Sequence, residues 1–346
     1  MEHAGGVRNS LSKWCEMPSE HALLVLSAAD VRELLTIGLA IESQRTAFME
    51  LGRGRALLPA RLLIEGDQDS VSFCYAARLA PDGGAVCKFG SVNPANANLG
   101  LPTISALITI LDGADGRPVA IMDGTAVTTI RTSAASAVAV QALANPHSTS
   151  LAILGTGVQA EAHVRAISRV LELTSVRVWG TNAEKCAALV RALDKQHEFD
   201  VTHALTAEQA VRDADVVVGC TTSFDPVIET DWLRQGTLVI SIGSFASNRC
   251  EVPQDLLSRA DAVVVDDVDT AIEHAGPIVA AVSSGLLAKD QLISLGQVIA
   301  GLRRARNKPS DVIYYNSVGI GVQDAAAAVV VVDAARASGR GQSVNL

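Results

Sequence analysis

Charged residues are scarce in this chain of 346 residues: they account for 19% of it, only six of them are lysines, and the formal net charge is -9. Affinity for a nucleic-acid backbone comes mainly from clustered lysine and arginine. The composition therefore argues against a nucleic-acid partner, and we expect a small-molecule ligand instead.

The sequence also lacks the spacings that bind metals or form disulfide frameworks. No two of the six cysteines make a CxxC pair, and the seven histidines show no HExxH spacing. Zinc sites normally show such patterns. We therefore predict no metal site, and reduced cysteines that suit the cytoplasm. The cysteines are Cys15, Cys74, Cys87, Cys186, Cys220 and Cys250.

No apolar run approaches the roughly 18 residues of a membrane-spanning helix, although 49% of the residues are hydrophobic. The N-terminal segment lacks the basic and apolar parts of a secretory signal, and we expect residues 1–20 to form a loose tail. These features predict a globular cytoplasmic protein with no membrane attachment. A chain of this length suits two domains, each with its own core.

The first third of the sequence has the pattern of an α+β domain. Apolar residues at helical spacing predict one helix over residues 29–52. Residues 56–92 contain short apolar runs separated by GDQD and PDGG, which is typical of antiparallel strands. ISALITIL and PVAIMD flank DGADGR and predict a hairpin, and the alanine-rich residues 125–144 predict a long helix.

The pattern of apolar residues changes beyond Pro146. The runs SLAIL, SVRVW, DVVVG, TLVISIG and AVVVDD alternate with helical segments, as in a parallel sheet covered by helices on both faces. The C-terminal segment IGVQDAAAAVVVVDAARA predicts a buried helix, which we expect to pack on the first domain. The fold class is therefore α/β.

A glycine-rich turn joins the first of these strands to the next helix. In SLAILGTGVQAEAHVRAI, Gly155, Gly157 and Ala160 have the spacing GxGxxA. The first glycine permits the tight turn, the second lets the backbone approach a pyrophosphate, and the alanine allows helix and strand to pack closely. The helix N-terminus adds N–H groups that bind an anion. This context predicts a Rossmann domain that binds a nicotinamide dinucleotide; the alternative is an ordinary strand-to-helix turn.

The end of the second parallel strand bears on the choice between NADP and NAD. NAD-selective domains usually carry an acidic residue there, which binds the ribose hydroxyls and would repel a 2'-phosphate. This sequence has Gly180, Thr181 and Asn182 instead, followed by Lys185. NADP is therefore preferred, and NAD is the alternative if Glu184 serves the ribose. The expected cofactor contacts are Gly155, Thr156, Gly157, Val158, Gln159, Gly180, Thr181, Asn182 and Thr221.

Four segments resemble the ornithine cyclodeaminase/mu-crystallin family, in that family's order: CKFGSVNPANANLGLPT, IMDGTAVTTIRTSAASA, LAILGTGVQA and YYNSVGIGVQD. The resemblance implies a Rossmann domain, residues 131–317, inserted into an α+β substrate-binding and dimerisation domain, residues 1–130 and 318–346. It also implies that Ser317 and Gly319 approach the nicotinamide.

The resemblance further implies an α-amino or α-imino acid substrate whose carboxylate is bound by cationic side chains. Arg61, Lys88 and Arg131 match family positions, and Thr103 matches one near the nicotinamide. Lys88 lies in an apolar strand, where an unpaired ammonium is costly, so it needs an anion. Structural alternatives are a strand-edge lysine, an ion pair of either arginine with a carboxylate such as Asp123, and a strand threonine.

The resemblance also bears on the reaction. Cyclodeaminases of this family carry an aspartate in the loop after the fifth Rossmann strand, where it handles the substrate amine. Counting back from Glu251, that position is Phe245, and SIGSFASNRCEV contains no aspartate. The loss of a proton acceptor weakens cyclodeamination, whereas hydride delivery to an imine relies chiefly on positioning. We therefore expect NAD(P)H-dependent reduction of an imino acid, such as the cyclic ketimine 1-pyrroline-2-carboxylate, and leave the proton donor open.

Other functions stay open at this point. An ornithine cyclodeaminase or an amino-acid dehydrogenase would need another residue in place of the aspartate, and a non-catalytic NADP-dependent ligand-binding protein would use the same anchors. A homodimer is also expected, because the apolar strands of residues 56–111 exceed what one small domain can cover.

Overall fold

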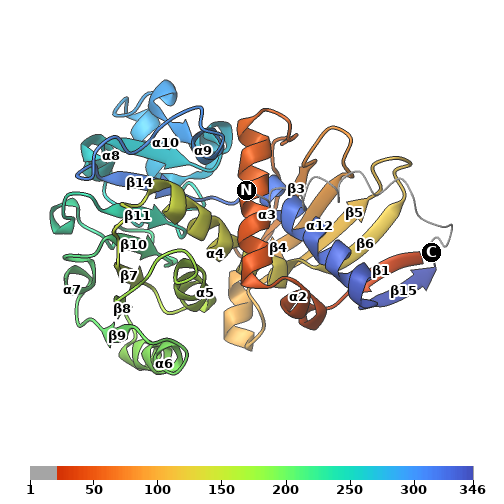
Figure 1. The fold of residues 1–346 in the computed structure, drawn as a ribbon, viewed down its shortest axis with the longest axis horizontal. Coiled ribbons are helices and arrows are strands. Elements are labelled where there is room, and N and C mark those ends of the chain that lie inside the picture. Colours follow the sequence, from red (N-terminus) through yellow and green to blue (C-terminus); the bar gives the residue numbers. More distant parts are fainter. Residues whose placement is uncertain (1–21, 346) are drawn as a thin grey trace, which may run out of the picture. The chain divides into compact units, whose positions relative to one another are not determined.

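The computed structural model describes residues 22–345 and divides into two compact units, coloured by sequence in Figure 1. The discontinuous unit comprises Met1–Arg131 and Ile320–Leu346, and the inserted unit comprises Thr132–Gly319. The expected domain boundaries lie one residue before the first junction and two before the second. The expected N-terminal tail and Cys15 lie outside the described residues. Within residues 22–345, no helix is both long and apolar enough to cross a bilayer.

The discontinuous unit contains a seven-stranded sheet with the order β15-β1-β6-β5-β4-β3-β2. From β2 to β6, neighbouring strands pair antiparallel as the sequence predicts, and β5 and β6 form the expected hairpin. The edge strand β15 pairs antiparallel with β1, which runs parallel to β6. The strands are β1 (Ala22–Leu26), β2 (Leu62–Glu65), β3 (Val71–Ala77), β4 (Val86–Val92), β5 (Ile104–Leu111), β6 (Pro118–Asp123) and β15 (Gln342–Asn345).

The helices of this unit correct one expectation and confirm another. A single helix over residues 29–52 is wrong, because Leu35 leaves helical geometry and the Thr36 side chain then caps a second helix by accepting from the Leu39 N–H. The expected C-terminal helix is α12, which packs on α3, β3 and β4 (Figure 1). The helices are α2 (Ala28–Leu34), α3 (Ile37–Gly52), α12 (Gly321–Ser338) and a 3-10 helix, η2 (Pro94–Leu99).

The inserted unit is a Rossmann fold. Its sheet has eight parallel strands in the order β13-β12-β14-β11-β10-β7-β8-β9. The strand order reverses at β7, with β8 on one side and β10 on the other, which is where such sheets bind ligands beyond their carboxyl ends. The strands are β7 (Ser150–Leu154), β8 (Ser175–Trp179), β9 (Asp200–His203), β10 (Val216–Gly219), β11 (Leu238–Ser241), β12 (Ala262–Val265), β13 (Ile293–Ser294) and β14 (Ile313–Asn316).

Helices connect these strands. The long alanine-rich helix expected from the sequence is α4 (Gly124–Leu143), which continues from the discontinuous unit into the inserted one. The remaining helices are α5 (Val158–Ile167), α6 (Ala183–Asp194), α7 (Ala207–Val211), η3 (Thr230–Trp232), α8 (Gln254–Arg259), α9 (Val268–His274), α10 (Gly276–Ser283), η4 (Lys289–Gln291) and α11 (Leu295–Ile299).

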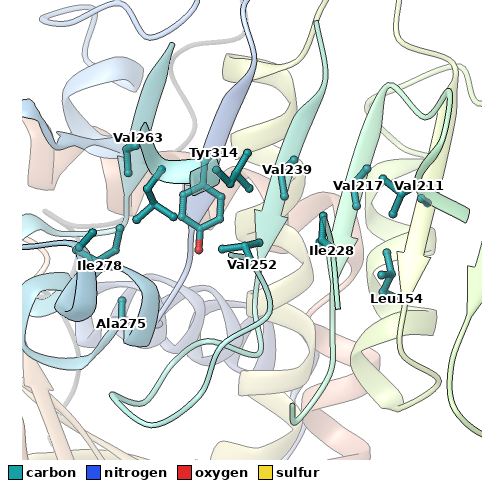
Figure 2. Packing of buried hydrophobic residues seen from close by; sticks show 14 of the residues in the cluster. Leu154, Val211, Val217, Ile228, Val239, Val252, Val263, Ala275, Ile278 and Tyr314 are labelled. Carbon is teal, nitrogen blue, oxygen red and sulfur yellow. The ribbon is translucent and has the colours of Figure 1, made fainter. Parts of the chain in front are cut away.

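The core of the inserted unit is built on the central strands (Figure 2). Val217, Val239 and Val263 come from β10, β11 and β12, and Tyr314 of β14 lies among them with its ring fully buried. Ile278 of α10 packs against the same cluster. Strands buried on both faces carry continuous apolar runs, so the polar groups of this unit gather in the loops beyond the strand ends.

Candidate active site

The glycine turn after β7 has the geometry that a diphosphate requires. Gly155 has φ +122, and a Cβ there would lie 2.5 Å from the carbonyl oxygen of Cys220, so only glycine fits. Gly157 is the N-cap of α5 and makes no side-chain cap, which leaves the first N–H groups of this ten-residue helix for another acceptor. A Cβ at Gly157 would meet nothing within 4 Å. These features fit the pyrophosphate of a dinucleotide.

Buried polar contacts hold α5 in place behind this turn. His163 donates from Nδ1 to the carbonyl of Gln159 over 2.7 Å, and its Nε2 accepts from the Ser136 hydroxyl of α4 over 2.9 Å. Burial lowers the pKa of His163 to about 4, so the ring is neutral at physiological pH. Val158 is exposed, and Thr156 is partly exposed beside it. The residues expected to surround the cofactor's phosphates therefore lie on one turn.

The end of β8 contains no carboxylate, as the sequence indicates. Gly180 approaches the glycine turn so closely that a Cβ would lie 2.9 Å from Cγ2 of Thr156. Thr181 is exposed, and Asn182 caps α6 by accepting from the Lys185 N–H over 2.9 Å. The Asn182 amide oxygen is thus used inside the protein, and its amide nitrogen is the group left for a ligand.

Glu251 organises the loops after β10 and β11. Its carboxylate accepts from the Thr221 N–H (2.6 Å), the Thr221 hydroxyl (2.8 Å), the Ser241 hydroxyl (2.7 Å) and the Gly243 N–H (2.7 Å). Burial raises the pKa of Glu251, and these hydrogen bonds oppose the shift. Thr221 was expected to contact the cofactor, yet both of its donors serve Glu251.

A buried aspartate holds Ser317 and Gly319, the two residues of the YYNSVGIGVQD segment that were expected near the nicotinamide. This aspartate was not singled out from the sequence. Asp266, which follows β12, accepts from the Ser317 hydroxyl over 3.1 Å and from the Gly319 N–H over 2.7 Å. The Tyr315 hydroxyl donates to its other oxygen. Because the Gly319 N–H serves Asp266 and the Ser317 N–H donates to the Ser241 carbonyl over 3.0 Å, any approach of these residues to a nicotinamide would use their carbonyls.

The discontinuous unit brings two of the expected substrate anchors together on a buried carboxylate. Lys88 Nζ lies 2.6 Å from Oδ2 of Asp324, and Arg131 Nε donates to Oδ1 over 2.9 Å. Their side chains are 3%, 5% and 1% exposed for Lys88, Arg131 and Asp324. Arg131 also donates from Nη1 to Gln323, and Lys88 donates to the Thr128 hydroxyl over 3.4 Å.

The charges in this cluster act on one another. Burial lowers the pKa of Lys88 to about 8, while Asp324 raises it and Arg131 and Arg61 lower it. Burial alone would raise the pKa of Asp324, but Arg131 and Lys88 hold it below its ordinary value. Asp324 lies in the first turn of α12, where the helix dipole also favours a negative charge.

An aromatic residue links the third anchor to the cluster. The guanidinium carbon of Arg61 lies 4.8 Å from the ring centroid of Tyr75, and Lys88 Nζ lies 5.0 Å from the same centroid. Tyr75 and Lys88 are directly opposite on β3 and β4. Arg61, Lys88 and Arg131, three of the four expected substrate residues, are therefore close together in this unit. The Tyr75 ring contacts the first two.

Asp123 and Thr103 make contacts outside this cluster. Arg131 forms the ion pair that was its structural alternative, with Asp324 as the carboxylate, whereas Asp123 accepts from the Ala126 N–H at the start of α4. Thr103 is exposed, its carbonyl accepts from Asn93, and no described contact joins its side chain to the cluster. A charged residue inside the apolar sequence of α12 was the available signal for Asp324.

The parallel sheet and its glycine turn define a Rossmann-fold protein. More specifically, the chain belongs to the ornithine cyclodeaminase/mu-crystallin family, whose model matches residues 21–339.

Named relatives of this chain include enzymes of two kinds. It is 30% identical over 322 residues to an alanine dehydrogenase of Archaeoglobus fulgidus, covering 93% of this chain and 98% of the relative. Its structure resembles that of Thermococcus litoralis Delta(1)-pyrroline-2-carboxylate reductase in complex with NADH and L-proline, with TM-score 0.89, 28% identity, and 93% and 100% coverage. It also resembles an archaeal alanine dehydrogenase dimer with bound NAD, with TM-score 0.89, 29% identity, and 94% and 99% coverage.

Proposed function

We propose that this protein is an NAD(P)H-dependent oxidoreductase that reduces an imino acid to the amino acid, with a cyclic ketimine such as 1-pyrroline-2-carboxylate as the model substrate. The observation that carries the proposal is the excess of positive charge beside Lys88. Lys88 and Arg131 contribute two positive charges against the single negative charge of Asp324, which leaves a formal charge of +1 for an anion to balance, and Arg61 adds to the positive potential at Lys88.

The cationic side chains retain donors for that anion. Lys88 has three N–H donors, and two of them are directed at Asp324 and Thr128. Arg131 has five N–H donors, and two of them bind Asp324 and Gln323. A substrate carboxylate suits the remaining donors, because charge-assisted hydrogen bonds are the strong ones. Asp324 fixes the direction of both side chains before substrate arrives.

The inserted unit is proposed to hold the cofactor. Gly155, Gly157 and the uncapped start of α5 would bind its diphosphate, while Thr181 and Asn182 would face the adenosine ribose. A bound reduced nicotinamide supplies the hydride for the imine carbon. We propose NADP as the preferred form because none of the three residues directly after β8, Gly180, Thr181 and Asn182, carries a carboxylate. Glu184 in the first turn of α6 and the NADH and NAD in the similar structures favour NAD as the alternative.

The loop after β11 disfavours cyclodeamination. Phe245 stands where the resemblance places the cyclodeaminase aspartate, its side chain is 36% exposed, and no aspartate replaces it in residues 241–251. An amino-acid dehydrogenase is the second candidate, favoured by the 30% identity to an alanine dehydrogenase. A ligand-binding protein without turnover would use the same anchors and is separated from both by an activity assay.

We also propose a homodimer formed through the sheet of the discontinuous unit. Leu62, Cys74, Phe89 and Leu107 are register partners across four strands, on the face opposite Lys88. Leu62, Phe89 and Leu107 are 57%, 55% and 51% exposed. An apolar row of this kind usually marks an interface, and the similar archaeal alanine dehydrogenase is a dimer.

A turnover screen tests the proposal. Oxidation of NADPH and NADH would be followed with 1-pyrroline-2-carboxylate, its six-membered homologue, and pyruvate with ammonia. The proposal expects turnover of a cyclic ketimine exceeding that of pyruvate with ammonia. Turnover of pyruvate alone would favour the dehydrogenase, ammonia release from ornithine would favour the cyclodeaminase, and cofactor binding without any turnover would favour a ligand-binding protein.

A further inference from the structure

Residues 301–308 lie between α11 and β14, at the edge of the inserted unit's sheet where the strands begin. The chain enters β14 at Ile313, and the Ser310 carbonyl accepts from the Gly236 N–H, just before β11, over 2.9 Å. β14, β11, β10 and β7 are parallel neighbours, so their amino ends share one edge and their carboxyl ends share the other. The glycine turn at Gly155 follows the carboxyl end of β7, so residues 301–308 lie at the edge opposite to it.

This segment is basic in a chain whose net charge is negative. The chain has 28 lysines and arginines against 37 aspartates and glutamates, yet its sequence contains no acidic residue between Asp290 and Asp311. Half of the segment is cationic, because residues 303, 304, 306 and 308 are arginine, arginine, arginine and lysine. The segment is therefore a local excess of positive charge.

Three of these arginines line a pocket of about 490 Å³. Arg303, Arg304 and Arg306 share it with apolar residues, among them Leu302 and, from the end of α4, Ala142. The described residues that line the pocket all belong to the inserted unit, and none of them is acidic. Pockets of roughly 300–1,000 Å³ are typical of small-molecule ligands. The pocket therefore combines the size of a small-molecule site with a positively charged lining.

Arg303 and Arg304 keep their donors for a ligand. Both are exposed, and neither has a carboxylate partner within residues 22–345. Other exposed arginines of this unit are paired, as Arg165 of α5 is with Glu161 over 2.7 Å. Because exposed ion pairs contribute little to stability, Arg303 and Arg304 can be changed without a large effect on folding.

Arg306 is bound by neutral groups. Its Nε donates to the Leu143 carbonyl at the end of α4 over 2.7 Å, and its Nη1 donates to the carbonyls of Pro309, over 3.3 Å, and of Asp311. Its Nη2 is buried and has no hydrogen-bond partner among the described residues. Burial lowers the pKa of Arg306, and Asp311 and Asp261 oppose the shift. Carbonyls orient the guanidinium but leave its positive charge, which favours an anion in the adjoining pocket.

The backbone of the segment is fixed at both ends. The Leu302 N–H donates to the Gln297 carbonyl of α11 over 2.9 Å. At the other end, the Asp311 carboxylate accepts from the Asn307 N–H over 2.7 Å and from the Lys308 N–H over 2.8 Å. This acid therefore serves backbone amides, and a segment held at both ends loses less conformational entropy when it binds a ligand.

We propose that residues 301–308 form a binding site for a phosphorylated small molecule, separate from the site of the dinucleotide. A phosphate group carries up to two negative charges and three acceptor oxygens, which match several guanidinium edges better than one carboxylate does. Leu302 and Ala142 would contact the carbon part of the ligand. Binding at this site requires no turnover, so it does not depend on the proposed reaction.

A matched set of probes tests the inference. Phenyl phosphate has a phosphate group and carbon surface, benzoate has a carboxylate in place of the phosphate, and inorganic phosphate lacks the ring. Calorimetry with saturating NADP, which occupies the dinucleotide site, and roughly 0.15 M KCl, which screens weak surface attraction, would compare them. Phenyl phosphate should bind once per chain with Kd below about 1 mM and at least roughly threefold more tightly than the other two probes.

A double variant assigns the binding to the segment. Arg303→Gln combined with Arg304→Gln should weaken phenyl phosphate binding by at least roughly tenfold. The matched control, Arg191→Gln combined with Lys195→Gln, removes two exposed cations at the end of α6 in the same unit and should leave the Kd within about twofold. The melting temperature and the NADPH dissociation constant should stay close to the unaltered values in both variants, which shows that each one folds.

Several results would overturn the inference. A Kd above about 1 mM for phenyl phosphate would exclude a specific site, and an equal loss of binding in the control variant would assign the attraction to overall charge. Benzoate binding as tightly as phenyl phosphate would exclude a phosphate site, and inorganic phosphate binding as tightly would exclude a ligand with a carbon framework. Binding that is seen without NADP and disappears when NADP is saturating would assign the probe to the glycine turn.

Discussion

Lys88 and Asp324 form an ion pair of 2.6 Å between β4 and the first turn of α12, and their side chains are almost completely buried. The two residues are far apart in the sequence, yet the helix packs on the strand so that the carboxylate meets the ammonium. Arg131 binds the other oxygen of Asp324. The expected anchors of a substrate carboxylate are thus already arranged by a carboxylate of the protein.

Asp324 should be more important for stability than Lys88. Asp324→Asn leaves two buried cations without their counter-ion and is expected to lower the free energy of unfolding by about 3–5 kcal/mol. Lys88→Met should cost less, because Asp324 keeps its 2.9 Å contact with Arg131. Denaturant unfolding of both variants checks the order.

The matched control for this comparison is Asp333→Asn on the same helix. Asp333 is half-buried, and the charge that acts on it is Arg336 rather than Lys88. The Asp333→Asn variant loses the same charge as Asp324→Asn, and its free energy of unfolding should change by less than about 1 kcal/mol. A Lys88→Met protein less stable than Asp324→Asn would contradict the arrangement of charges described above.

Binding of a substrate carboxylate should weaken as pH rises through about 8. The pKa of Lys88 is lowered from 10.5 to about 8, chiefly by burial, so the ammonium is lost in the folded protein while an unfolded chain keeps it up to about pH 10.5. Between these values the unfolded state binds more protons, so the Lys88 contribution to stability rises with pH. The affinity for an anion falls over the same window, because the positive charge disappears.

The dissociation constant of piperidine-2-carboxylate, measured by calorimetry from pH 6 to 10 with NADP bound, separates these effects. The unaltered protein should lose affinity above about pH 8, whereas Lys88→Arg should hold its affinity across that range because arginine stays charged. The same loss of affinity in both proteins would assign the titration to another group.

Much of the fold could be predicted because its signals are local. The glycine spacing of Gly155 and Gly157, the alternation of strand and helix, and the alanine-rich α4 each depend on neighbours in the chain. Contacts between residues far apart in the sequence could not be predicted in the same way. The structural alternative for Arg131 was an ion pair with a carboxylate such as Asp123, eight positions away, but that carboxylate caps α4, and the residue that binds Arg131 lies 193 positions further on.

The helix break at Leu35 and the role of Thr221 show the same limit. Hydrophobic spacing continues across Leu35, so the spacing did not mark Thr36 as the residue that caps a second helix. Thr221 was expected at the cofactor from its place after β10, but its donors are taken by Glu251, 30 positions later. Sequence position located the loop after β10 but did not decide what the Thr221 side chain binds, and it did not locate the break at Leu35.

The cofactor preference should change with Asn182→Asp. Aspartate caps a helix as well as asparagine does, so the bond to the Lys185 N–H at the start of α6 is kept and folding should be unaffected. The added charge would repel a 2'-phosphate, and NADPH affinity should fall by at least roughly tenfold while NADH affinity changes little. Fluorescence titration of both cofactors checks this. An unaltered protein that binds NADH tenfold more tightly than NADPH would contradict the assignment of NADP.

The central claim is that hydride is delivered to the carbon that bears the carboxylate of an imino acid. The most direct measurement uses reduced cofactor carrying deuterium at the transferable position, with 1-pyrroline-2-carboxylate and its six-membered homologue as substrates, and mass spectrometry and NMR of the amino acid formed. The account predicts one deuterium at the α-carbon of each product molecule, and slower formation of this labelled product, in step with kcat/KM, when Lys88 is changed to Met. Cofactor that keeps its deuterium in the presence of every imino acid, or product labelled elsewhere, would contradict it.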